Sequence, residues 1–122
     1  MGAQGIAKGD REVLRDLARR WRDHASNPVM AKRKRLWTTV HDLEPVRPMI
    51  LFETASVAGF VDPDELRCTD PFLRAVERNL RDTVRHADDV GDDIVVEPWL
   101  RLAWRIRYPS FGVVVGACSG GG

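Results

Sequence analysis

The chain has 122 residues, a formal net charge of +1 and a hydrophobic fraction of 43%. A chain of this length forms one domain, and it is too short for a complete (β/α)8 barrel, which needs about 250 residues. The composition is typical of a soluble globular protein and argues against a wholly disordered chain. The near-zero net charge gives no case, at the level of the whole chain, for a polyanion partner such as nucleic acid.

The first predicted element is a helix over residues 10–25, with apolar residues at helical spacing and Asp10 as its N-cap. A second helix starts at Asn27-Pro28, with Asn27 as cap, and ends before Glu44-Pro45. The short apolar run 49–52 follows two prolines and is predicted to be a buried strand.

In the second half, Asp62-Pro63 begins a short helix, and Asp70-Pro71 begins the longest helix, which extends to about residue 88. Residues 94–97 are predicted to form a second strand. Further β-like runs follow at 100–106 and 111–115. We therefore expect an α/β domain over residues 10–115, with disordered ends at 1–9 and 116–122.

The charge is divided unevenly along the chain. Residues 1–35 hold ten Lys and Arg against four Asp and Glu, whereas residues 61–97 hold five Arg against eleven Asp and Glu. We expect these two segments to attract each other before either binds a polyanion. The run Lys32-Arg33-Lys34-Arg35 supports an alternative, in which the chain is a small non-enzymatic α+β module that binds nucleic acid or protein through its basic helices.

Several kinds of site and signal have no motif in the sequence. It lacks GxGxxG, P-loop, GxSxG and HExxH patterns, a long apolar span and an apolar secretory signal. Cys68 and Cys118 are far apart and have no CxxC partner, which favours a reduced, cytoplasmic setting. We therefore expect a cytoplasmic protein without a membrane partner, and no metal site within the chain.

Two carboxylates are the candidate substrate-binding residues, because Glu53 and Glu97 each follow a predicted strand. The alternative is that each is a loop carboxylate satisfied by a nearby cation. Asp92-Asp93 could be a metal or base pair, although a solvated turn after Gly91 is the simpler interpretation. The other polar candidates are better explained by packing or helix capping than by catalysis. These are Cys68, His41 and His86.

Three blocks of sequence keep a fixed order over about residues 11 to 115. The first contains Arg35, Leu36, Trp37, His41, Leu43, Pro45, Arg47, Pro48, Met49 and Glu53. The second runs from Leu66 to Arg74 and continues to Glu77, Leu80 and Arg81, and the third runs from Gly91 to Leu100. Together they resemble the N-terminal region of uroporphyrinogen-decarboxylase-like proteins, in particular the branch related to corrinoid-dependent methyltransferases.

The resemblance implies a (β/α)8 barrel, of which this chain would supply the leading helices and first strands as a truncated fragment with little activity alone. It implies methyl transfer or decarboxylation, with Glu53 and Glu97 at the mouth of the barrel. In full-length methyltransferase relatives a zinc ion is held by His and Cys, and the methyl donor is a corrinoid on a partner protein. Those ligands come from later parts of the barrel, so no zinc ligand is assigned to this chain.

Overall fold

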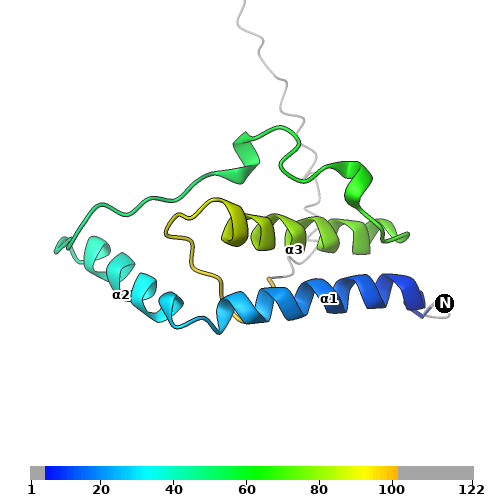
Figure 1. The fold of residues 1–122 in the computed structure, drawn as a ribbon, viewed down its shortest axis with the longest axis horizontal. Coiled ribbons are helices and arrows are strands. Elements are labelled where there is room, and N and C mark those ends of the chain that lie inside the picture. The colour runs from blue at the N-terminus through cyan, green and yellow to red at the C-terminus, as the bar shows by residue number, and fades with distance from the viewer. Residues whose placement is uncertain (1–4, 102–122) are drawn as a thin grey trace, which may run out of the picture.

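The computed structural model describes residues 5–101, and these residues form three α-helices and two single 3-10 turns (Figure 1). In chain order the elements are α1 (Lys8–Ala25), α2 (Val29–His41), η1 (Thr54–Ser56), η2 (Pro63–Glu65) and α3 (Pro71–Asp89). None of these described helices is both long and apolar enough to cross a membrane.

The predicted α/β class is wrong, because residues 5–101 contain no strand and so none of the first strands of a partial barrel. Residues 49–52 and 94–97 both lie outside any regular element, and only one backbone bond joins the two stretches of chain, from Asp93 N–H to Ile50 C=O at 2.9 Å. A strand needs a continuous ladder, and here aspartate side chains take two of the amide donors that a ladder would use. The runs 102–106 and 111–115 lie outside the described residues.

The core lies between α1 and α3, which run parallel and side by side (Figure 1). Asp10 contacts Thr69 just before the start of α3, and at the other end Arg20 pairs with Asp88 at 2.6 Å. Between these ends, buried apolar side chains fill the helix interface and its surroundings. They are Leu17, Met30, Val61, Leu66, Cys68, Leu80, Val84 and Val96.

Side-chain hydrogen bonds mark the three helix starts that the Asn-Pro and Asp-Pro pairs predict. Asp62 and Asp70 are N-caps, whereas the N-cap of α2 is Pro28, one residue after the predicted Asn27. Asn27 Oδ1 accepts from Val29 N–H at 2.9 Å, Asp62 Oδ1 accepts from Asp64 N–H at 2.9 Å, and Asp70 Oδ1 accepts from Leu73 N–H at 3.0 Å. Each bond satisfies an amide that has no partner within its helix. The local signals in the sequence therefore place these helix starts to within a residue or two.

The predicted start of the first helix is wrong by two residues. α1 begins at Lys8 and so includes Lys8 and Gly9 of the segment predicted to be disordered. Asp10 does not cap α1, because its buried carboxylate accepts bonds from Thr69 N–H at 2.9 Å and Asp70 N–H at 3.2 Å. The Thr69 amide bond outweighs burial, so the pKa of Asp10 lies below its usual range.

A second buried carboxylate anchors the chain that leads into α3. Glu77 is fully buried and accepts from the amides of Arg67 and Cys68 at 2.9 and 2.8 Å, and from Arg81 Nε at 2.8 Å. Burial alone would raise the pKa of Glu77, but these bonds lower it. Arg74 completes the attachment by donating to the carbonyls of Leu66 and Cys68. Side chains of α1 and α3 thus satisfy the backbone of this loop.

Ion pairs join the basic N-terminal helices to the acidic segment, as the charge pattern predicts. Arg20 of α1 pairs with Asp88, and Lys34 of α2 pairs with Glu97 at 2.7 Å. The guanidinium of Arg33 donates to the carbonyl of Ile94 at 2.9 Å. Part of the basic half is therefore neutralised within the molecule.

Candidate functional site

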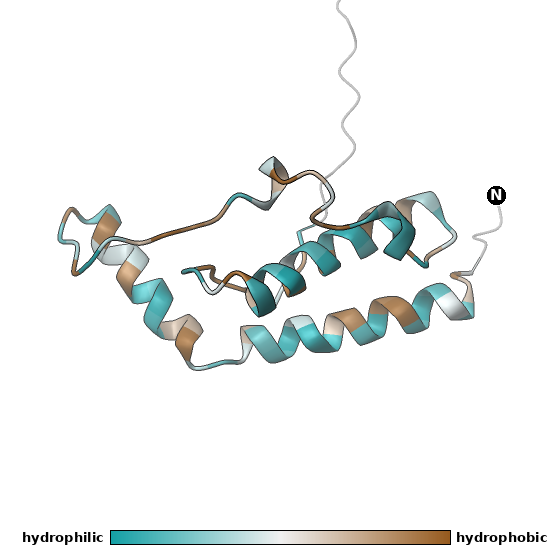
Figure 2. Cartoon of the chain, turned by 45° about the horizontal axis from the view of Figure 1, so that its top comes forward, coloured by the Kyte–Doolittle hydropathy of each residue, from teal (hydrophilic) through white to brown (hydrophobic). Residues whose placement is uncertain are grey.

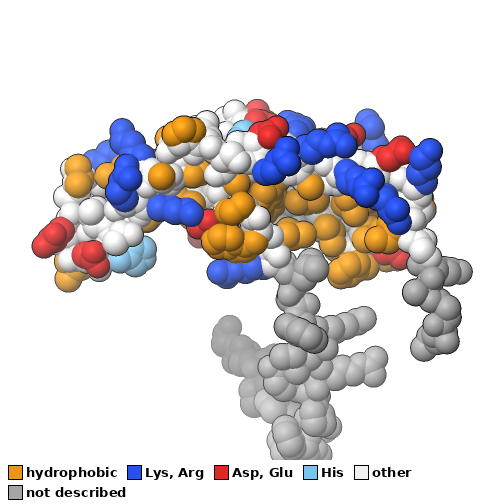
Figure 3. Space-filling view, turned by 90° about the horizontal axis from the view of Figure 1, so that it is seen from below, with side chains coloured by type: hydrophobic (Ala, Val, Ile, Leu, Met, Phe, Trp, Pro, Cys, Tyr) orange, Lys and Arg blue, Asp and Glu red, His pale blue; other side chains and the backbone are white. Residues whose placement is uncertain are grey.

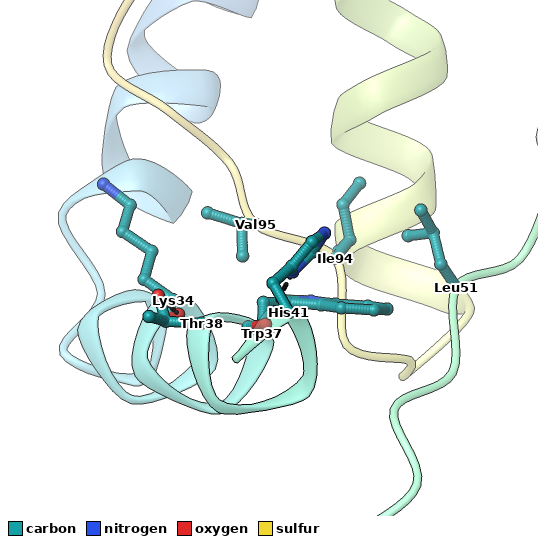
Figure 4. Close-up of a pocket in the computed structure, with 7 residues that line it drawn as sticks. All are labelled: Lys34, Trp37, Thr38, His41, Leu51, Ile94 and Val95. Carbon is teal, nitrogen blue, oxygen red and sulfur yellow. Dashed lines mark hydrogen bonds between the residues drawn. The ribbon is translucent and has the colours of Figure 1, made fainter. Parts of the chain in front are cut away.

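The candidate site is a shallow apolar groove of about 620 Å³ between α2 and two extended stretches of chain (Figure 4). We call it the α2 groove. α2 supplies one wall, residue 51 supplies part of the second, and residues 94 and 95 supply the floor. Its lining residues are Lys34, Trp37, Thr38, His41, Leu51, Ile94 and Val95.

The wall from α2 follows from helical spacing, since residues 34, 37, 38 and 41 recur on one face of a helix. Hydrogen bonds fix its aromatic members. Trp37 Nε1 donates to the carbonyl of Asp93 at 2.9 Å, and His41 Nδ1 lies 2.7 Å from the carbonyl of Trp37. The groove wall is therefore held in place without being covered.

The opposite wall belongs to the extended segment, which we define as residues 46–53. Asp93 holds it, because this carboxylate pairs with Arg47 at 2.7 and 2.9 Å and accepts from Ile50 N–H at 2.9 Å. The Arg47 bond and the Ile50 amide lower the pKa of Asp93 well below its ordinary value. The buried carboxylate of Asp93 thereby joins the extended segment to the loop after α3, which lies far from it in the sequence.

Asp92 provides a second attachment for the same segment. Its carboxylate accepts from Phe52 N–H at 2.7 Å and Ile94 N–H at 3.1 Å, and lies 2.7 Å from Nε2 of the buried His86. Burial alone would raise the pKa of Asp92, but these bonds lower it. Asp92 and Asp93 are thus structural clamps and not the solvated turn predicted from the sequence.

Apolar side chains around the groove are exposed. The extended segment is strongly hydrophobic along most of its length and lies on the outside of the molecule (Figure 2). Ile50, Leu51 and Phe52 are exposed to 66%, 55% and 41%. Val46 and Leu43 extend the same surface toward the end of α2. Side chains alternate between the two faces of extended chain, so Leu51 lines the groove, whereas Ile50 and Phe52 lie on the other face, where the Phe52 ring is 6.5 Å from that of Phe60.

Leu43 combines this exposure with a strained backbone. Its φ is +61°, a left-handed conformation that usually belongs to glycine, and its side chain is 88% exposed. It is the residue after the C-cap of α2, where Leu43 N–H donates to the carbonyl of Val40 and Glu44 N–H to that of Thr39. This is a Schellman motif with leucine in the glycine position. The strain has no compensation from burial, so it points to a use of the side chain outside the fold.

The two predicted site carboxylates are not brought together in the α2 groove. Glu53 is exposed and precedes η1, and its carbonyl accepts from Ser56 N–H. Glu97 pairs with Lys34, and its carbonyl accepts from Trp21 Nε1 at 2.6 Å. Neither follows a strand, because the strands are absent from the described residues.

Cys68 is fully buried, and its sulfur lies 3.9 Å from the carbonyl of Asp10. Burial and the neighbouring Glu77 carboxylate raise the pKa of its thiol to about 12, so it behaves as a small hydrophobic residue. Within residues 5–101, no three His, Cys, Asp or Glu side chains are placed to hold a metal ion.

Sequence reasoning missed the α2 groove because it predicts a buried strand over residues 49–52, which places Leu51 in the core. The signal available was the pair Pro45 and Pro48, which forces extended chain next to the end of a helix. Nothing in the sequence marks Leu43, since a left-handed leucine has no compositional signature.

Comparison of the chain with protein-family models, with curated proteins and with solved structures found no match. The similarity to uroporphyrinogen-decarboxylase-like proteins thus stays a prediction from the three sequence blocks.

Proposed function

We propose that this chain is a docking module from the N-terminal region of a uroporphyrinogen-decarboxylase-like enzyme, and that it binds the catalytic domain through the α2 groove. The observation that carries the proposal is the open, mostly apolar α2 groove, in which Trp37 of α2 and the exposed Leu51 of the extended segment face each other across Ile94 and Val95 (Figure 4). The module has no reaction of its own to perform. Zinc and a corrinoid, where an enzyme of this class uses them, belong to the catalytic domain and its partner protein.

The contacts between the three sequence blocks support this proposal. Trp37 of the first block donates to Asp93 of the third, and Arg47 of the first pairs with the same residue. In the second block, Glu77 binds the amides of Arg67 and Cys68. The residues that carry the resemblance therefore stabilise the helical unit through two polar clusters, one between the first and third blocks and one within the second. Such a unit suits an element that precedes a barrel and packs on it.

The energetics of the exposed surface support docking as well. Burial of apolar surface stabilises an interface by about 25 cal/mol per Å², and here several large side chains face solvent with no cover from the described residues. Leu43 is held in a strained conformation with its side chain projecting into solvent. A complex that buries these side chains would gain the free energy of apolar burial, which would also offset the backbone strain at Leu43.

Co-expression with the catalytic (β/α)8 domain of a uroporphyrinogen-decarboxylase-like enzyme, deleted for its own N-terminal helices, tests the proposal. We expect the two proteins to purify together. Thr38→Glu should weaken binding about tenfold or more, because a carboxylate in the mostly apolar groove must lose water when the partner binds. Titration calorimetry of the purified pair measures the affinity.

Lys32→Gln is the matched control. It makes the same change of one charge unit on α2, at an exposed position outside the groove lining. It should leave the affinity unchanged. Absence of binding by the unmodified chain, or equal binding by the Thr38→Glu variant, would overturn the proposal.

A second candidate function, phosphate binding, is favoured by the outer side of α1. Arg15, Arg19 and Arg22 line a shallow depression there, and Figure 3 shows several Lys and Arg side chains close together near one end of this face, beside a group of hydrophobic side chains. Binding of a short DNA duplex that weakens steeply with salt, and is lost in an Arg15→Gln, Arg22→Gln double variant, would support it. Salt-independent or absent binding would exclude it.

A further inference from the structure

The extended segment presents an open main-chain edge. The N–H groups of Ile50 and Phe52 point toward the loop after α3, where the carboxylates of Asp93 and Asp92 accept their hydrogen bonds. In an extended backbone, alternate residues direct their N–H and C=O groups to opposite edges. The groups of Met49, Leu51 and Glu53 therefore face the other way.

Apart from the C=O of Glu53, which accepts from Ser56 N–H at 3.2 Å, the groups on that outer edge have no partner in the described part of the chain. Neither the N–H nor the C=O of Leu51 forms a hydrogen bond there, and neither does the N–H of Met49 or of Glu53. The side chain of Leu51 is exposed as well. Proteins usually block such an edge with a charge, a proline or a covering element, because it is a template for pairing with another strand.

The edge is complementary to itself. In an antiparallel pair, two residues directly opposite each other exchange both of their N–H···O bonds. If two copies of the segment lie antiparallel with Leu51 opposite Leu51, each supplies one donor and one acceptor, and Met49 of one copy meets Glu53 of the other. The arrangement has two-fold symmetry, the commonest symmetry among homodimers. The charge does not oppose it, since the chain carries only +1.

From this edge we infer a homodimer in which residues 49–53 of two chains pair as antiparallel strands about a two-fold axis at Leu51. The occupant of the edge is thus a second copy of this chain. The inference goes beyond the proposed docking function, because it uses the main chain of the extended segment and not the α2 wall of the groove. Because the two-fold axis places residue 51 opposite residue 51 of the second chain, like charges at this position should prevent the dimer.

Charge substitutions at residue 51 test the inference. We expect the unmodified protein to show twice the monomer mass by light scattering at high concentration. Leu51→Lys and Leu51→Glu should each be monomeric, because like charges then lie directly opposite each other. An equimolar mixture of the two variants should recover the dimer. Far-UV circular dichroism confirms that each variant keeps its helices.

A main-chain substitution provides a second test. Leu51→Pro removes the outward N–H without removing a bond of the described fold, and should abolish the dimer, whereas Leu51→Thr keeps the N–H and should retain it. Thr38→Glu, which weakens docking, should leave the dimer intact, so the two proposals fail separately. A monomer at all concentrations, a dimer of Leu51→Lys alone, or no dimer in the mixture would overturn the inference.

Discussion

The two halves of the molecule differ in where their apolar side chains lie and in what their carboxylates bind. Between α1 and α3, Leu17, Leu80 and Val84 are buried, and the carboxylates of Asp10 and Glu77 are enclosed and fully bonded. After the end of α2, Leu43, Ile50 and Leu51 lie at the surface, and the carboxylates of Asp92 and Asp93 hold the backbone of the extended segment. In the first half, buried side chains stabilise the fold. In the second half, aspartates bind the backbone of a segment whose apolar side chains are exposed.

This difference separates stability from interaction. Substitutions in the α1–α3 half should change the free energy of unfolding, whereas exposed residues of the α2 half should change binding with little effect on stability. The following predictions, from the largest expected effect to the smallest, test how sharp that separation is.

Glu77→Ala should be the most destabilising change, by about 3–5 kcal/mol, because it leaves Arg81 and two loop amides without a partner in a buried site. Urea denaturation followed by circular dichroism measures the loss. Glu12→Ala is the control, since Glu12 is exposed on α1 and only 3.9 Å from an exposed Lys8. A loss for Glu77→Ala as small as that of the control would show that the polar core is dispensable.

Stability should also fall in acid. The pKa values of Glu77, Asp10, Asp92 and Asp93 are lowered in the folded protein. The unfolded chain therefore takes up protons first as the pH falls. The stabilisation is complete above the unfolded pKa values of about 4 and is lost as the pH falls through the lower folded values.

Urea midpoints measured between neutral and acidic pH test this dependence, and the decline should begin near pH 5. Asp93→Asn should flatten the decline, since an amide at this position does not titrate. An unchanged slope in this variant would show that the Asp93 clamp contributes no pH dependence.

Leu43→Gly should raise the free energy of unfolding by about 1 kcal/mol, because glycine adopts the left-handed conformation without strain. The same change should weaken docking to the catalytic domain about tenfold, because it deletes an exposed apolar side chain. Thermal unfolding and calorimetry give the two values. A gain in stability with unchanged docking would remove Leu43 from the proposed interface.

Leu51→Ser should change the free energy of unfolding by less than about 0.5 kcal/mol, since the side chain is more than half exposed. Leu80→Ala, at a buried position of α3, provides the contrast and should cost about 2–5 kcal/mol. Equal losses for the two variants would mean that the α2 half contributes to the core after all.

The sequence predicts those features of the structure that depend on residues close together in the chain. Asn27, Asp62 and Asp70 lie beside the helices whose starts they mark, so spacing alone reveals them. The extended segment was assigned to a strand because its apolar run matches one, but a strand also needs a partner that local sequence does not specify. The aspartates that replaced this partner lie about forty residues away. The α2 groove depends on the same long-range contacts, so it was out of reach of sequence patterns.

The parallel arrangement of α1 and α3 has a consequence for how the chain folds. Two parallel helices cannot be joined by a short turn, and here the bond between Asp10 and Thr69 spans 59 positions of sequence. During synthesis α1 emerges long before α3, so the apolar side of α1 stays exposed to solvent until α3 has been made. Closing a loop of this length precedes any gain from the core, so we expect this small helical protein to fold more slowly than a bundle of antiparallel neighbours.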